Sequence, residues 1–150
     1  MTEKSRTDAL TAELQPLLTE LTDLALAGKQ AHWNVTGPLF LPVHQQLDDL
    51  VSDTRSWADQ VAERIMALGG SADGRAATVA AQTPFAAMPA GRITGDKAIA
   101  LMVERLDIVI AAGRRRIEAL DDTDLVSQDL VIAAVAGLEK HRWMFSAQQR

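Results

Sequence analysis

The sequence predicts an all-α protein, a single four-helix bundle with a short extra helix in the long connection between the second and third helices. Apolar residues recur at helical spacing through four long segments, and no segment alternates as a strand does. Glycine and proline gather in two short zones that separate these segments. The 150 residues, 47% of them hydrophobic, suffice for one domain with a substantial core.

The first helix is expected over about residues 9–33, where leucines recur at helical spacing. Pro16 marks either the end of its first turn or a kink. Residues 1–8 are polar and of mixed charge, so we expect a mobile tail. The sequence NVTGP at 34–38 ends the helix, and the connection to the next one is short. The first two helices should therefore form an antiparallel pair.

The other helices follow from the same periodicity. The second is expected from residue 39 or 42 to residue 68, where two glycines end it. The connection over about 71–95 is rich in Gly, Ala, Thr and Pro, with one or two helical turns at 76–82. A crossover of this length lets the second and third helices run parallel. The third helix is expected over 96–120, and the fourth over about 125–148.

Four side chains able to bind a metal share one stripe of the second helix. At about 100° per residue, His44, Asp48, Asp59 and Glu63 fall within about 100° of one another. The first two and the last two are i,i+4 pairs, and the pairs lie roughly 16 Å apart along the axis. A single ion with bonds of about 2.0–2.2 Å cannot span that distance.

Two arrangements resolve this separation. Either each chain carries two half-sites, or a second copy of the helix runs antiparallel across a two-fold axis. In the second arrangement the histidine pair of one subunit faces the carboxylate pair of the other, and two identical sites form at once. Our hypothesis is the intersubunit metal site, which requires at least a dimer.

Composition excludes several classes of function. The net charge of −5 argues against a generally basic surface for nucleic acid. The chain has no cysteine, which rules out disulfides and thiolate chemistry. No leader sequence and no apolar run of about 18 residues is present, so we expect a cytoplasmic protein that does not enter a membrane.

The motifs resemble those of one known family. The sequence HWNVTGPLF begins at His32, a second histidine follows twelve residues later, and an aspartate comes four residues after that. The segment WADQVAER then supplies an aspartate and a glutamate, and LEKHRWMF lies in the last helix. This pattern closely resembles the Dps family of ferritin-like mini-ferritins over about residues 10–147. The resemblance implies a ferritin-like bundle that assembles as a dodecameric hollow shell and stores ferric mineral.

The resemblance also implies a ferroxidase that oxidises Fe(II), usually with hydrogen peroxide. By position, His32, His44 and Asp48 come from one subunit, and Asp59 and Glu63 from its two-fold mate. His32 and the mate's two carboxylates would hold the tighter iron, and the other two side chains would assist a second. Imidazole and carboxylate suit Fe(II), and carboxylates become more favourable as it turns into Fe(III). The usual ferritin centre is excluded, because no Glu-x-x-His motif occurs.

Further residues have candidate roles. Trp33, beside His32, is most simply a packing residue but could absorb stray oxidising equivalents. Hollow shells admit cations through acidic channels at symmetry axes. The candidates for an iron-uptake pore are Asp121, Asp122, Asp124 and Asp129, with Asp129 best placed by resemblance. The alternative for this group is helix capping in a solvated turn.

Other readings remain open at this point. Taken alone, His32 would be a helix-end hydrogen-bonding group, and the carboxylates would be solvated charges. Trp57 is expected to be a packing residue, His141 a structural or surface residue, and the run Arg114–Arg116 a solvated face. A DNA-compacting, nucleoid-associated protein is the main alternative function, which acidic composition and few tail cations disfavour. A helical assembly that binds zinc or another ion without redox chemistry is the third.

Overall fold

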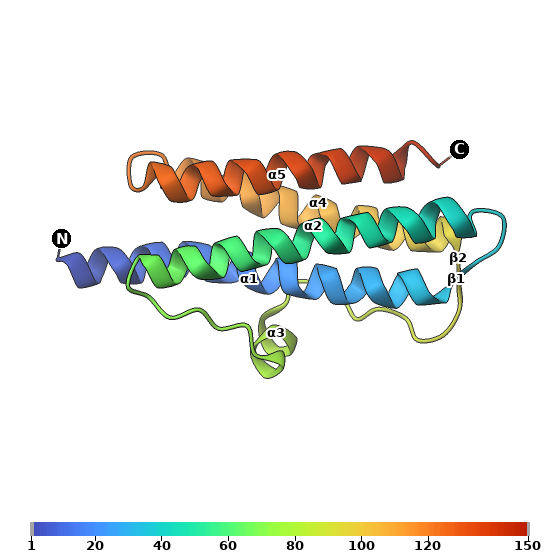
Figure 1. Cartoon of the computed structure of the whole chain (residues 1–150), viewed down its shortest axis with the longest axis horizontal. Coiled ribbons are helices and arrows are strands. Elements are labelled where there is room, and N and C mark those ends of the chain that lie inside the picture. Colours follow the sequence, from blue (N-terminus) through green and yellow to red (C-terminus); the bar gives the residue numbers. More distant parts are fainter. Residues whose placement is uncertain (1, 150) are drawn as a thin grey trace.

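Four long helices lie side by side along the longest dimension of the molecule (Figure 1). The structure is a computed structural model that describes residues 2–149. The long helices are α1 (Glu3–Asn34), α2 (Phe40–Ala67), α4 (Gly95–Leu120) and α5 (Leu125–Ser146). Helix α1 packs antiparallel to α2, and α4 packs antiparallel to α5. The predicted all-α four-helix bundle is confirmed.

The connection between α2 and α4 crosses the length of the bundle. It carries the short helix α3 (Ala76–Gln82), which packs against α1, and it lets α2 and α4 run parallel as expected (Figure 1). Two short parallel strands that we did not predict, β1 (Val35–Thr36) and β2 (Ile93–Thr94), join the α1–α2 connection to the start of α4. Two residues are too few to show a strand period in the sequence.

Helix α1 begins earlier than the sequence suggested. Thr2 is its N-cap, and the Thr2 hydroxyl accepts a hydrogen bond from the backbone N–H of Ser5 at 3.2 Å. The Arg6 guanidinium donates to the carbonyl of Thr123, and the Thr7 hydroxyl to that of Leu68. Residues 3–8 of the expected tail are therefore the first turns of α1, while Met1 lies outside the described residues.

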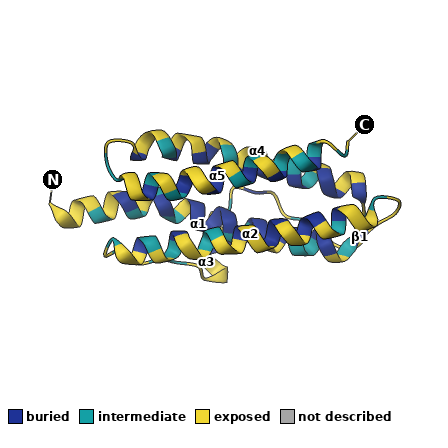
Figure 2. Ribbon diagram, turned by 45° about the horizontal axis from the view of Figure 1, so that its top comes forward, coloured by how far each residue is buried: buried dark blue, intermediate teal, exposed yellow. Residues whose placement is uncertain are grey.

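The core fills the space between the two helical pairs (Figure 2). Its largest fully buried side chains are Leu14, Leu17, Leu21, Leu24, Leu47, Leu50, Ile65, Ile99, Met102, Leu106, Leu120 and Phe145. A buried ion pair crosses this core, in which Arg116 donates to both carboxylate oxygens of Glu20 at 2.7 and 2.8 Å. The run 114–116 is therefore not a solvated face at Arg116, because that guanidinium finds a buried carboxylate on α1.

The contact between α2 and α5 depends on a glycine. A Cβ at Gly137 would lie 2.2 Å from the indole ring of Trp57, so only glycine lets the two helices approach this closely. His141 is buried beside the same ring and hydrogen-bonds to Asp53 through Nε2 at 2.8 Å. The structural roles expected for Trp57 and His141 are confirmed. Among the helices of residues 2–149, none has both the length and the apolar character needed to cross a membrane.

Candidate metal centre

The histidine of the HWN segment and the histidine of α2 meet at one end of the bundle. His32 lies in the last turn of α1, and His44 lies in the second turn of α2. Between them the chain passes through β1 and reverses at Gly37, whose φ of 96° favours glycine. The backbone N–H of Phe40 then donates to the carbonyl of Gly37 at 3.0 Å. This tight connection brings residues twelve positions apart into contact.

Each histidine hydrogen-bonds to the backbone of the other. Nδ1 of His32 lies 2.8 Å from the carbonyl oxygen of His44, and Nδ1 of His44 lies 2.8 Å from that of His32. The rings stack with centroids 3.7 Å apart and an angle of 17° between their planes. A carbonyl only accepts, so both Nδ1 atoms carry the proton. In the neutral rings each Nε2 keeps its lone pair, the state in which imidazole binds a metal.

Asp48 lies one turn after His44 and forms an ion pair with Lys29 of α1. The hydrogen bond from the Lys29 ammonium holds the pKa of Asp48 below its ordinary value. The carboxylate therefore stays ionised, but an internal cation already occupies it. The sequence reasoning missed Lys29, although its position three residues before His32 places it near that histidine on the helix surface.

Asp59 and Glu63 form the other half of the stripe and stand apart from the histidines. Both are exposed on α2, and within residues 2–149 neither takes part in an ion pair or a side-chain hydrogen bond. The structure thus brings His32 and His44 into contact, with Asp48 one turn further on, and leaves Asp59 and Glu63 further along the helix. In the described part of the chain, no three His, Asp or Glu side chains gather closely enough to hold a metal ion.

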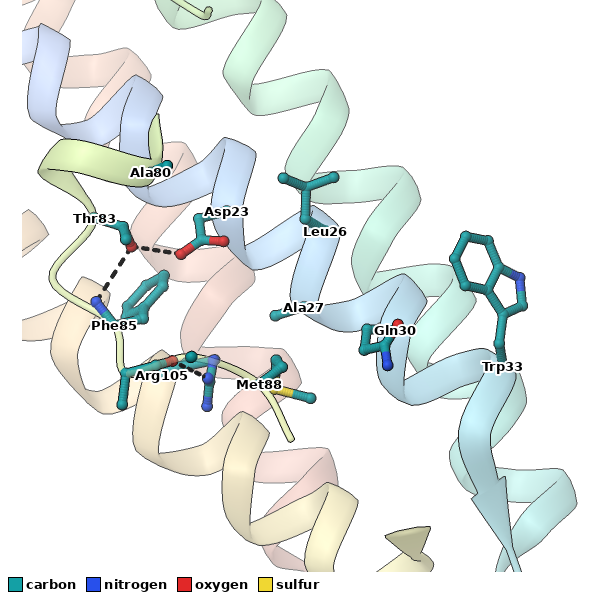
Figure 3. A pocket seen from close by; sticks show the side chains of 12 residues that line it. Asp23, Leu26, Ala27, Gln30, Trp33, Ala80, Thr83, Phe85, Met88 and Arg105 are labelled. Carbon is teal, nitrogen blue, oxygen red and sulfur yellow. Dashed lines mark hydrogen bonds between the residues drawn. The ribbon is translucent and has the colours of Figure 1, made fainter. Parts of the chain in front are cut away.

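Trp33 does not pack into the core of its own chain. Its side chain is 69% exposed at the edge of a cavity of about 620 Å³ between α1, the segment 83–88 and α4 (Figure 3). The floor of this cavity contains Arg105, whose guanidinium donates to the carbonyl of Ala86 at 2.6 Å. This hydrogen bond attaches the crossover segment to α4. Burial lowers the pKa of Arg105. The expectation that Trp33 is simply a packing residue is wrong within one subunit.

The four acidic residues near the α4–α5 turn divide into two kinds. Asp124 is the N-cap of α5, accepting from the Ser127 backbone N–H at 3.2 Å and from Arg64 at 2.6 Å. Burial would raise the pKa of Asp124, but the hydrogen bonds from Ser127 and Arg64 outweigh it and lower the pKa. Asp121 accepts from Gln128, and both Asp122 and Asp129 are exposed. Capping therefore accounts for Asp124.

These donor groups suit a divalent ion of borderline softness. Two imidazole nitrogens and one carboxylate lie at one half-site, and two exposed carboxylates lie at the other. Imidazole binds Fe, Zn and Cu, whereas carboxylates favour harder ions. A mixed set accommodates an ion whose charge rises during a reaction. Neither half-site alone supplies the ligands of a closed structural metal site.

Comparison with known proteins identifies the family. The sequence profile of the ferritin-like domain matches residues 11–150. A DNA protection during starvation protein of Mycolicibacterium smegmatis is 40% identical over 134 residues, 89% of this chain and 73% of the relative. Dps from Microbacterium arborescens in the high iron form has a TM-score of 0.90 at 37% identity, covering 95% of this chain and 93% of that one. Dps92 from Deinococcus radiodurans has a TM-score of 0.93 at 31% identity, covering 95% and 87%.

The similarity agrees with the bundle and with the motifs. It extends over nearly the whole chain, from the profile to the arrangement of the helices. The crossover with its short helix and the HWN segment lie inside the matched region. The chain therefore belongs to the Dps family of ferritin-like proteins.

Proposed function

We propose that this protein is an iron-storage ferroxidase that oxidises Fe(II) at a site shared by two subunits. The observation that carries the proposal is the crossed pair of His32 and His44. Their Nδ1 atoms are held by backbone carbonyls, which leaves both Nε2 atoms available for a metal. Asp48 lies one turn beyond His44, and the exposed carboxylates of Asp59 and Glu63 lie on the same stripe of α2.

The site becomes complete when two subunits face each other. His32, with Asp59 and Glu63 of the partner subunit, would hold the tighter Fe(II), and His44 and Asp48 would assist a second. Lys29 competes for Asp48, so the second ion has the weaker position. The relatives named above, one of them described in a high iron form, support iron as the substrate.

Hydrogen peroxide, or O₂, is the proposed oxidant. One peroxide accepts one electron from each of two Fe(II) ions, its O–O bond breaks, and two protons complete two waters as two Fe(III) form. The carboxylates stabilise the higher charge of the ferric product and thereby favour oxidation. Because both electrons are delivered together, no hydroxyl radical is released, which protects the cell from oxidative damage.

The ferric product is proposed to collect as mineral inside a hollow dodecamer. Iron would reach the interior through acidic pores, and Asp129 is the leading candidate because its carboxylate is exposed. Asp121 and Asp122 are secondary candidates, whereas Asp124 is engaged by Arg64. Replacing Asp129 by Asn should slow iron uptake and leave assembly intact.

The test is an anaerobic Fe(II) titration followed by a pulse of hydrogen peroxide, with absorbance of ferric product as the readout. Wild type is compared with a His32→Ala, Asp59→Ala double variant. Asp49→Ala is the matched control, because Asp49 is an exposed carboxylate on the same helix but off the stripe. Fast oxidation that only the double variant loses supports the proposal. Equal rates in all three proteins contradict it and indicate a structural role or another metal.

DNA protection is the second candidate function, and the name of the relatives at up to 40% identity favours it. Two features of the chain oppose direct DNA binding. The net charge is −5, and Arg6, one of two cations before residue 10, donates to the Thr123 carbonyl. A gel shift with linear duplex DNA at low salt separates the candidates. If the wild type retards the DNA and the Lys4→Gln variant does not, binding through the start of α1 is supported.

A further inference from the structure

A buried arginine without a counter-ion lies at the floor of the cavity beside α1. Arg105 is 3% exposed, and its guanidinium donates to the carbonyl oxygens of Leu101 at 3.1 Å and Ala86 at 2.6 Å. Its Nε–H is also buried and finds no acceptor within residues 2–149, where Arg105 takes part in no ion pair. A buried cation with a free N–H is unfavourable, so this end of the cavity favours an anionic group.

A carboxylate lies at the same end of the cavity. Asp23 of α1 accepts a hydrogen bond from the Thr83 hydroxyl through Oδ2, and within residues 2–149 its Oδ1 accepts none. Figure 3 shows this second oxygen turned away from Thr83. The Thr83 hydroxyl also accepts from the backbone N–H of Phe85 at 3.2 Å, and the centre of the Phe85 ring lies 5.8 Å from the guanidinium carbon of Arg105. The segment 83–85 therefore contacts both charged groups.

The two charges select the kind of ligand that fits between them. Burial lowers the pKa of Arg105 and the negative charge of Asp23 opposes that shift, so the two groups interact although no ion pair joins them. A phosphate ion would be repelled by the carboxylate, and a divalent cation would be repelled by the guanidinium. A zwitterion places an opposite charge against each of them.

The rest of the cavity is largely apolar. Leu26, Ala27 and Met88 contribute to its walls, and Trp33 lies at its edge (Figure 3). The wall formed by α1 extends from residue 23 to residue 33, roughly 15 Å along the helix axis. The volume of about 620 Å³ is typical of small-molecule sites, which range over about 300–1,000 Å³. A large apolar side chain therefore fits beyond a charged head group.

We infer that this cavity binds a free α-amino acid with a large apolar side chain. The ligand's carboxylate accepts from the Nε–H of Arg105, and its ammonium group donates to Oδ1 of Asp23. Its side chain extends along Ala27 toward Trp33. The inference goes beyond the proposed function and does not depend on it, because none of these residues is among the candidate iron ligands.

Titration calorimetry on the intact, iron-free protein tests the class of ligand. The probe is L-phenylalanine. Its analogue L-phenylalaninamide lacks the carboxylate, and 3-phenylpropionate lacks the ammonium group. Each analogue should bind about tenfold more weakly or worse, because each loses one charged hydrogen bond. Absence of L-phenylalanine binding, or equally tight binding of either analogue, would overturn the inference.

A charge substitution tests the role of Asp23. Asp23→Asn keeps an oxygen that accepts from Thr83, but it removes the negative charge that faces the ligand's ammonium group. L-phenylalanine should bind to this variant about tenfold more weakly, whereas 3-phenylpropionate should bind no more weakly than it does to wild type. Wild-type affinity of Asp23→Asn for L-phenylalanine would overturn the assignment.

A substitution that obstructs the cavity gives a second test, which leaves both charged groups in place. Ala87 is an exposed residue of the cavity wall, so Ala87→Trp should abolish binding of L-phenylalanine. Ala90→Trp is the matched control, because Ala90 is exposed in the same connection and does not line the cavity. Circular dichroism verifies that both variants are folded. Wild-type affinity in a folded Ala87→Trp protein would place the binding site elsewhere and overturn the inference.

Discussion

The two halves of the candidate site differ in how far the folded chain has already organised them. His32 and His44 are held by two hydrogen bonds and a ring stack, and Asp48 by an ion pair. Asp59 and Glu63, about three turns further along the same helix, are exposed and have no such contacts within residues 2–149. The same helix thus presents one half that is preorganised and one that is not.

This difference indicates which ligands are already ordered in the folded chain and which would be ordered by metal binding. The ordering of the histidines is part of folding, so metal binding does not have to supply it. Under the proposed function, the ion and the partner subunit would order the carboxylates of Asp59 and Glu63. Within residues 2–149 the carboxylates of Asp59 and Glu63 form no ion pair, so no internal cation has to be displaced before they bind an incoming one.

The largest effect is expected for variants that each lack a ligand from one half of the site, studied separately and then co-assembled. His32→Ala and Glu63→Ala should each lower the rate of Fe(II) oxidation by about 100-fold or more, because each removes a ligand. A randomly co-assembled mixture should recover about a quarter of the wild-type rate, since half the dimers are mixed and each mixed dimer has one intact site. The two variants are unfolded and refolded together, and stopped-flow absorbance then measures the rate of Fe(II) oxidation.

Two controls accompany the mixture. His32→Ala refolded alone, and the two variants mixed without unfolding, should both stay inactive. A mixture that remains as slow as its components would place all ligands in one subunit and remove the contrast between the halves.

The next effect concerns stability. His44→Ala should lower the free energy of unfolding by about 1–3 kcal/mol, because it removes the stack and leaves the His32 carbonyl without its partner. Glu63→Ala should change it by less than about 0.5 kcal/mol, since the side chain is exposed and forms no ion pair or hydrogen bond within residues 2–149. Urea unfolding of iron-free protein at fixed concentration measures both. Equal losses would show that the second half is also organised before metal binds.

The sequence predicted the bundle better than the site, and particular residues show why. Helical spacing and the break at NVTGP place the helices to within a few residues, except at the start of α1, because these signals are local. The α3 bounds also agree with expectation. The start of α1 was placed too late, because the hydrogen bond from Arg6 to the Thr123 carbonyl in the α4–α5 turn does not show in a local pattern.

Within the site, the sequence supplied the residue types but not their contacts. The i,i+4 spacing put His44 beside Asp48, yet the crossed hydrogen bonds to His32 depend on the turn at Gly37. Lys29 and the Glu20–Arg116 pair were missed because ion pairs between helices depend on how the helices pack. The exposure of Trp33 likewise follows only from the three-dimensional arrangement.

The same contrast exists between Asp124 and Asp129 on α5. Asp124→Ala should destabilise the fold at pH 7 by about 1–2 kcal/mol through loss of the N-cap, without changing Fe(II) oxidation. The pKa of Asp124 is lowered in the folded chain, so its contribution is complete above its unfolded pKa of about 3.9. It is lost as the pH falls through the folded pKa. The difference between wild type and variant in thermal unfolding should therefore shrink below about pH 4.

Asp129→Asn is the matched comparison for Asp124→Ala. Its side chain is exposed, so the unfolding curve should be that of wild type at every pH while iron uptake slows. A destabilised Asp129→Asn protein, or a pH-independent loss in Asp124→Ala, would contradict the division of these acids into structural and free groups.

The smallest expected effect tests the one feature that limits the preorganised half. Lys29→Met keeps an unbranched side chain of similar length and removes the ammonium that pairs with Asp48. Asp48 then faces an incoming cation without a competitor, and the second Fe(II) should bind about threefold to tenfold more tightly, as expected for a partly exposed charge pair. Anaerobic titration calorimetry resolves the two binding steps, and Lys140→Met, an exposed lysine on α5, is the control. If Lys29→Met weakened the second binding step instead, Lys29 would position Asp48 for the ion rather than compete with it. The preorganised half of the site would then depend on the ion pair between Lys29 and Asp48.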